Sequence, residues 1–202
     1  MYRRNFRRLN SSVCNRYNNR RKLNCAVYGM SNEEFEQQLE DNIYEAFQEI
    51  TGTDINIFET FSDVYVQTDM TVRGTEYPDA KLNVELTIDV GSGLPPVRCY
   101  TGLYEDDAPL DIYDQCKTMA ETALNSIKYN IAEAFCTYIE EHSSDLDIEE
   151  CYVIPGERYN LWEIDVAIDA PYGHSGAYTV RIAPERRSIE DAAQAIITRC
   201  SR

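Results

Sequence analysis

Apolar residues recur every three or four positions in the first strongly patterned segment, which predicts an amphipathic helix over residues 31–52. Ser31 with Glu34 three residues later forms a capping box, in which the two side chains satisfy free backbone N–H groups of the first turn. Gly52 is typical of a residue that ends a helix. The predicted buried stripe consists of Phe35, Leu39, Ile43, Phe47 and Ile50.

Alternation of apolar and polar residues next predicts β-strands. The alternation is clearest at residues 82–90, where aliphatic side chains share one face and polar or charged side chains share the other. Residues 62–73 and 97–103 predict two further strands. Gly and Pro in residues 74–80 and 91–96 predict the turns between the strands.

A second, longer helix is predicted over residues 110–142. At ~1.5 Å per residue it would span roughly 45–50 Å, so we expect it to be either long and curved or broken near Asn125. Its predicted buried stripe consists of Ile112, Cys116, Met119, Ala123, Ile127, Ile131, Phe135 and Tyr138.

The same order of elements then recurs. Strands are predicted over residues 148–154, 161–170 and 177–182, and Ser188 begins a last helix. The hexapeptide NIYEAF at residues 42–47 matches NIAEAF 88 positions later, and the strongest strands of the two halves match at an offset of 80. These matches indicate an internal duplication.

The sequence therefore predicts an α+β fold of duplicated α-β-β-β units. Each unit has an antiparallel sheet with helices on its apolar face and the other face open to water, and a C-terminal helix closes the chain. We expect three segments: an extended basic arm at residues 1–30, a first unit at 31–110, and a second unit with the closing helix at 111–202.

The order helix–strand–strand–strand–helix resembles that of the double-stranded-RNA-binding domain. Arg186 and Arg187 stand where that family has a basic pair at the start of its last helix, but the family's third basic position is Glu190 here. The first unit has Ala-Pro-Leu at residues 108–110 in this region. The resemblance thus concerns the order of elements, and it assigns no RNA-binding residue.

Charge divides the chain sharply. Residues 1–30 contain eight basic and no acidic side chains, whereas the other 172 residues carry 11 basic and 35 acidic ones, a net charge of −24. Because a body of that charge repels phosphates, nucleic acid should contact the arm. The candidate nucleic-acid or partner-binding residues are Arg3, Arg4, Arg7, Arg8, Arg16, Arg20, Arg21 and Lys22.

Several roles for this arm are open. It could neutralise phosphates, dock on an acidic protein surface, serve as a mitochondrial transit peptide, or be a solvated tail. Our leading hypothesis is a non-enzymatic interaction protein of a larger assembly, such as a viral particle or a ribonucleoprotein. The alternatives are an organelle-targeted protein whose arm is an address, and a metal-binding protein or enzyme that uses its acidic strand faces.

Candidate chemistry is sparse elsewhere. Carboxylates two residues apart on the strands could bind Mg²⁺ or Ca²⁺, although a solvated sheet face is the simpler interpretation. His174 beside Ser175 could act as a general base, but the sequence lacks a GxSxG motif and a phosphate-binding glycine loop, so we expect a surface histidine. The acidic strand residues are Glu85, Asp89, Glu163, Asp165 and Asp169.

The cysteine pattern bears on compartment and cofactors. Seven scattered cysteines without a CxxC pair predict free thiols in a reducing compartment, either the virion or cytoplasm or, as the alternative, the mitochondrial matrix. No cofactor is expected. No apolar run approaches the ~18–20 residues of a membrane span. Other proteins of an assembly are the expected partners, and homo-oligomerisation stays open.

Overall fold

The computed structural model describes residues 32–52, 63–69, 82–91, 93–104, 109–155, 162–171, 174–183 and 188–201. The chain divides into two units, Met1–Phe35 and Glu36–Arg202. Within the first unit only the opening turn of a helix is described, and the predicted capping residue Ser31 and the basic arm lie outside the described residues. The elements are α1 (Asn32–Thr51), β1 (Asp63–Asp69), β2 (Leu82–Asp89), β3 (Val97–Leu103), α3 (Pro109–His142), β4 (Asp147–Pro155), β5 (Trp162–Asp169), β6 (Gly176–Ile182) and α4 (Ile189–Cys200).

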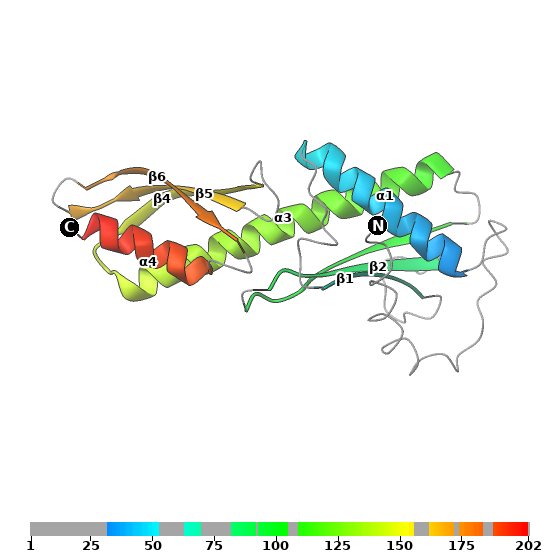
Figure 1. The fold of residues 1–202 in the computed structure, drawn as a ribbon, viewed down its shortest axis with the longest axis horizontal. Coiled ribbons are helices and arrows are strands. Elements are labelled where there is room, and N and C mark those ends of the chain that lie inside the picture. Colours follow the sequence, from blue (N-terminus) through cyan, green and yellow to red (C-terminus); the bar gives the residue numbers. More distant parts are fainter. Residues whose placement is uncertain are drawn as a thin grey trace, which may run out of the picture. The chain divides into compact units, whose positions relative to one another are not determined.

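The strands form two antiparallel three-stranded sheets, ordered β1-β2-β3 and β4-β5-β6. The second half of the chain thus repeats the order of elements and of strands in the first half (Figure 1). The predicted α+β class, antiparallel pairing and closing C-terminal helix are confirmed. The predicted domain boundary between residues 110 and 111 stays a prediction.

The aliphatic residues that alternate with polar ones along β2 and β5 form the inner face of each sheet. Val84, Leu86 and Ile88 are fully buried on β2, and Ile164 and Val166 are buried on β5. Figure 1 shows α1 and the first part of α3 on one face of the first sheet, and α4 with the last part of α3 on one face of the second. Each core therefore forms between the apolar face of a sheet and the apolar stripes of two helices.

Helix α3 is continuous from Pro109 to His142 and is not broken at Asn125. Its stripe is buried over the whole length and serves both cores. One end of the predicted stripe is wrong: Tyr138 is half-buried and stacks on the His142 ring, while Ile139 is fully buried instead. From Ile127 onward the buried residues are spaced four apart, so the residue after Phe135 in the stripe is Ile139. The predicted step of three residues, from Phe135 to Tyr138, would leave Ile139 exposed. The buried positions are Ile112, Cys116, Met119, Ala120, Ala123, Leu124, Ile127, Ile131, Phe135 and Ile139.

Helix ends follow local rules. Ser188 caps α4 by accepting a hydrogen bond from the backbone N–H of Asp191 at 3.0 Å. Gly52 has φ +63° and donates its N–H to the carbonyl of Gln48, so the predicted end of α1 is confirmed. Among the described residues, no helix has both the length and the apolar character needed to cross a bilayer.

The polar face of β2 is less open than its alternation predicts. Thr87 is only 3% exposed and Asn83 only 7%, although both share the polar phase with Glu85. Thr87 lies in register with Arg98 and donates its hydroxyl to Glu85 at 3.2 Å, so longer neighbours shield this short side chain. The Oδ1 atom of Asn83 has no hydrogen-bond partner among the described residues. The expectation that this whole face meets water is therefore wrong for the middle strand.

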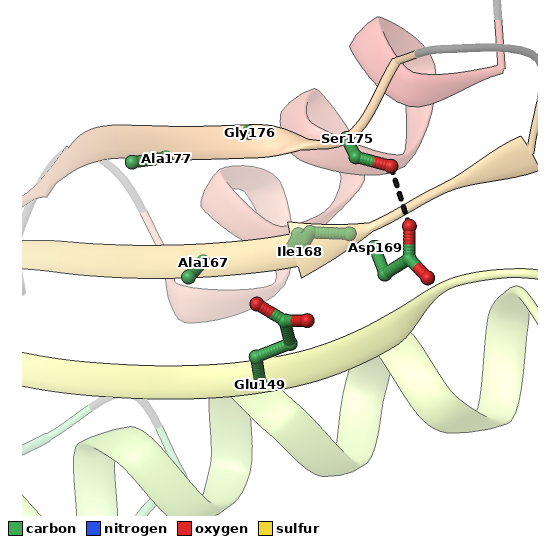
Figure 2. Close-up of a pocket in the computed structure, with 7 residues that line it drawn as sticks. All are labelled: Glu149, Ala167, Ile168, Asp169, Ser175, Gly176 and Ala177. Carbon is green, nitrogen blue, oxygen red and sulfur yellow. Dashed lines mark hydrogen bonds between the residues drawn. The ribbon is translucent and has the colours of Figure 1, made fainter.

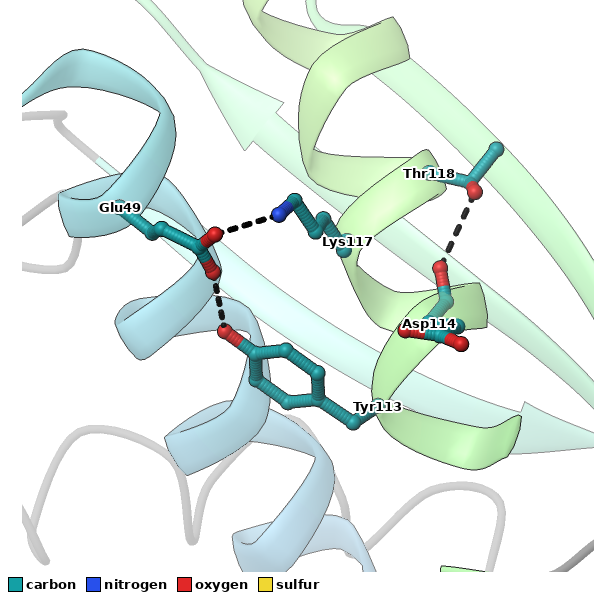
Figure 3. Close-up of polar contacts among 5 residues, drawn as sticks. All are labelled: Glu49, Tyr113, Asp114, Lys117 and Thr118. Carbon is teal, nitrogen blue, oxygen red and sulfur yellow. Dashed lines mark hydrogen bonds and ion pairs between the residues drawn. The ribbon is translucent and has the colours of Figure 1, made fainter. Parts of the chain in front are cut away.

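Polar contacts join α1 to α3 at the protein surface. Glu49 accepts hydrogen bonds from Lys117 Nζ at 2.5 Å and from the Tyr113 hydroxyl at 2.9 Å (Figure 3). The hydrogen bond from Lys117, and then that from Tyr113, lower the pKa of the Glu49 carboxyl. The same Glu49 contact raises the pKa of Lys117. This cluster links the two helices at the surface.

The continuity of α3 can be tested at its exposed midpoint. Asn125→Pro should lower the free energy of unfolding by about 3 kcal/mol or more, because proline removes a helical N–H and clashes with the preceding turn. Asn125→Ala at the same position should leave stability unchanged or slightly raised, because alanine has the higher helix propensity. Urea denaturation measures both variants. Equal stability of the two would contradict a continuous helix.

The Glu49 cluster predicts a pH-dependent contribution to stability. A carboxyl whose pKa is lowered by folding stabilises the protein above its unfolded pKa of about 4.3, and that stabilisation disappears as the pH falls through the folded value. Glu49→Gln should therefore lower Tm at pH 7, and the difference from wild type should shrink as the pH falls below about 4. Glu141→Gln, at the exposed end of α3, controls for net charge. A difference that keeps its full size from pH 7 to pH 3 would argue against the ionised pair.

Candidate functional site

The predicted binding residues of the arm lie outside the described residues, so their role stays a prediction. These residues are Arg3, Arg4, Arg7, Arg8, Arg16, Arg20, Arg21 and Lys22. The acidic strand residues, by contrast, are all described. Their surroundings show what the sheet faces can do chemically.

On the outer face of the second sheet, acidic residues of β5 are held by residues of β6. Glu163 forms an ion pair with Arg181, with Oε1 2.7 Å from Nε, and the two residues are in register. One step along the strands, Asp165 accepts a hydrogen bond from the Thr179 hydroxyl at 2.6 Å. These are cross-strand pairs of the kind that stabilise a sheet.

The first sheet repeats this arrangement. Glu85 on β2 accepts a hydrogen bond at 3.2 Å from the hydroxyl of Tyr100, its partner in register on β3. Glu85 thus occupies the place of Asp165, and Tyr100 that of Thr179. Burial of the Tyr100 hydroxyl, together with the nearby Glu85 carboxylate, raises the pKa of this tyrosine. The common carboxylate–hydroxyl pair is a structural counterpart of the sequence duplication.

The last carboxylate of each middle strand closes the turn that follows it. Asp89 accepts a hydrogen bond from the backbone N–H of Gly91 at 2.9 Å, and Gly91 has φ +75°, a conformation that favours glycine. Asp169 accepts a hydrogen bond from the Ser175 hydroxyl at 2.5 Å. Ser175 Oγ in turn accepts from the N–H of Ala170 at 2.9 Å, which ties both sides of the turn together.

A shallow hollow of about 330 Å³ lies beside this turn (Figure 2). The pairing of β4 with β5 shifts register between Ile148 and Glu150, and this β-bulge places Glu149 at the hollow. Figure 2 shows the Glu149 side chain reaching from β4 toward β5. The lining residues are Glu149, Ala167, Ile168, Asp169, Ser175, Gly176 and Ala177. The polar groups at the hollow are the carboxylates of Glu149 and Asp169 and the hydroxyl of Ser175. The Asp169 carboxylate already accepts a hydrogen bond from that hydroxyl.

These contacts bear on the metal hypothesis. Each of the five predicted carboxylates accepts a hydrogen bond, either from a residue in register on the next strand or from the turn that follows its own strand. Within the described segments, no group of three or more His, Cys, Asp or Glu side chains is placed to hold a metal ion. The geometry explains the acidic strand residues as parts of the sheets.

His174 and Ser175 make hydrogen bonds within and beside the β5–β6 turn. The Ser175 hydroxyl donates a hydrogen bond to Asp169. A serine nucleophile instead donates its hydroxyl proton to the general base. The carbonyl oxygen of His174 accepts a hydrogen bond from the Tyr178 hydroxyl at 2.5 Å. The contacts of both residues thus stabilise the β5–β6 turn.

The structure reveals an exposed apolar pair that the sequence analysis missed. Tyr152 is 60% exposed and Ile154 is 44% exposed on β4, an edge strand of the second sheet. They lie in register with Asp165 and Glu163 on the outer face, whereas Val153 between them is buried. The sequence signal that could have predicted this pair is the run of consecutive apolar residues at 151–154, which places apolar side chains on both faces of the strand.

The structure also pairs two cysteines whose association the sequence did not predict. Cys136 on α3 and Cys151 on β4 are half-buried, and their thiols hydrogen-bond to each other. This hydrogen bond lowers the pKa of Cys136, and it raises the pKa of Cys151 together with burial. By contrast, burial raises the pKa of Cys99 to about 11 and that of Cys116 to about 12. No motif in the sequence indicated the pair, since its members stand 15 positions apart on different elements.

Comparisons with protein-family models, with curated proteins and with solved structures give no match to this chain.

The turn-closing role of Ser175 predicts a measurable loss of stability. Ser175→Ala removes hydrogen bonds to Asp169 and Ala170 and should cost about 1 kcal/mol of unfolding free energy in urea. Ser144→Ala is a matched control, because the Ser144 hydroxyl lies 3.5 Å from Asp145 Oδ1, at the limit of a hydrogen bond. The control should change stability by less than about 0.5 kcal/mol. If the two variants lose the same amount, the turn network is not stabilising.

Proposed function

We propose that this protein is a non-enzymatic interaction protein of a larger assembly, such as a viral particle or a ribonucleoprotein. In this proposal the arginine-rich arm, residues 1–30, contacts nucleic acid or an acidic neighbour, and the body packs against other proteins. The observation that carries the proposal is the charge split between eight basic, acid-free positions in the arm and −24 in the rest of the chain.

Electrostatics favours the arm as the contact for an anionic partner. Arginine guanidinium groups bind phosphates and carboxylates through paired hydrogen bonds and stay charged at every physiological pH. The strongly anionic body repels phosphates, and it raises the local concentration of cations instead. Tyr2, Phe6 and Tyr17 within the arm add aromatic rings that can stack on unpaired bases.

Features of the described residues support a structural body. The carboxylates on the outer faces make hydrogen bonds within their own sheets, which accounts for them without a reaction. Tyr152 and Ile154 offer exposed apolar area on an edge strand, where a protein neighbour can pack. Tyrosine suits such contacts because its ring packs while its hydroxyl keeps a polar partner.

Salt-dependent binding tests the proposal. Wild type, a chain lacking residues 1–30, and two quadruple variants at Arg3, Arg4, Arg7 and Arg8 (all Gln or all Lys) are titrated with a fluorescent duplex at 50–200 mM salt. The Gln variant should reduce the slope of log K against log salt by about 3 to 4, since each phosphate contact contributes about 0.9. The Lys variant should keep the slope, because the positive charge is retained.

Other results would redirect or reject the proposal. If the chain without residues 1–30 binds the duplex as tightly as wild type, the arm is not the contact. Arm-dependent binding to polyglutamate but not to nucleic acid would identify an acidic protein as the neighbour. Mass spectrometry of the protein from its natural source distinguishes a binding arm from a transit peptide, because a mature chain that starts beyond about residue 25 would favour the transit peptide.

A further inference from the structure

The cysteine pair lies where a helix and a strand of one core meet. In the register of the second sheet, Cys151 pairs with Val166, whose side chain is buried on the inner face. Cys151 therefore points toward the helices. Cys136 follows the fully buried Phe135 on α3, which packs against β4. Both thiols thus lie at the margin of the core, half-buried, and each shifts the pKa of the other.

We propose that Cys136 and Cys151 form a site of reversible oxidation, at which a peroxide converts the two thiols into a disulfide that ties α3 to β4. The placement of both thiols where α3 packs on β4, with Cys151 facing the helices, carries this inference, because a disulfide needs its two sulfur atoms close together before it can form. The inference does not depend on the proposed function of the arm.

The chemistry balances with hydrogen peroxide as the oxidant. The Cys136 thiolate attacks one peroxide oxygen, the O–O bond breaks, and a sulfenic acid and hydroxide form. The Cys151 sulfur then attacks the Cys136 sulfur, and the sulfenic oxygen leaves as water with the thiol proton. In sum, two thiols lose two electrons and two protons, and one peroxide becomes two waters. A small thiol reductant reverses the reaction by thiol–disulfide exchange.

The environment selects this pair among the described cysteines. Cys99, Cys116 and Cys200 are buried, which limits contact with an oxidant. The hydrogen bond from Cys151 lowers the pKa of Cys136 and so increases its reactive thiolate fraction, although burial and the nearby Glu140 oppose this effect. The pair is also compatible with a reducing compartment, where disulfides form transiently in response to oxidants.

Peptide mapping tests the proposal directly on the full-length protein. Folded wild type is treated with hydrogen peroxide, its remaining thiols are blocked with iodoacetamide, and the chain is then cut after glutamate. Cys136 falls in the peptide 134–140 and Cys151 in the peptide 151–157. The expected result is a single species joining these two peptides, which separates on reduction. The oxidised protein should also melt roughly 5–10 °C higher than the reduced protein, because the cross-link restricts the unfolded chain.

Controls separate proximity from general reactivity. Cys136→Ser and Cys151→Ser should each abolish the linked species, whereas the double change Cys14→Ser with Cys25→Ser should retain it. The same peroxide treatment in 8 M urea should lose the preference for this link. The proposal is overturned if folded wild type yields the two peptides separately alkylated or overoxidised, or if the link forms equally well in urea.

Discussion

The fold depends on one helix whose apolar stripe has to be buried against two different sheets. Helix α3 has 34 residues, so it is about 50 Å long, whereas a strand of eight residues spans only about 26 Å. A stripe buried from Ile112 to Ile139 therefore cannot be covered by one sheet. Because the helix is continuous, each of its halves completes a core that would otherwise lack one helix.

The acidic strands illustrate how a sequence pattern that suggests a site can serve structure. Alternating carboxylates look like ligands for a divalent cation, but in the sheets they accept hydrogen bonds from residues in register or from the following turn. The repeated pair, Glu85 with Tyr100 and Asp165 with Thr179, shows the same solution in both halves. Half-buried carboxylates favour such partners because an unpaired charge at a sheet surface loses part of its hydration.

The elements could be predicted closely, and the candidate sites could not. Residues 97–103 were predicted as a strand and form β3 with those bounds, because period-two alternation depends on neighbours along the chain. The exposed Tyr152 and the thiol contact of Cys136 with Cys151 were not predicted, because each depends on how β4 pairs and on what covers it. The role of the arm rests on charge alone, which indicates the kind of partner but not its identity.

The sequence by itself determined the order of the helices and strands, approximately where each one lies, and most positions of its apolar face, since these properties follow from local periodicity and capping. Only the tertiary structure decided that Thr87 is buried on a polar face, that Ile139 replaces Tyr138 in the stripe of α3, and that two thiols meet. The physical reason is that burial and contact depend on neighbours brought from distant parts of the chain. Spacing along a single element carries no information about those neighbours.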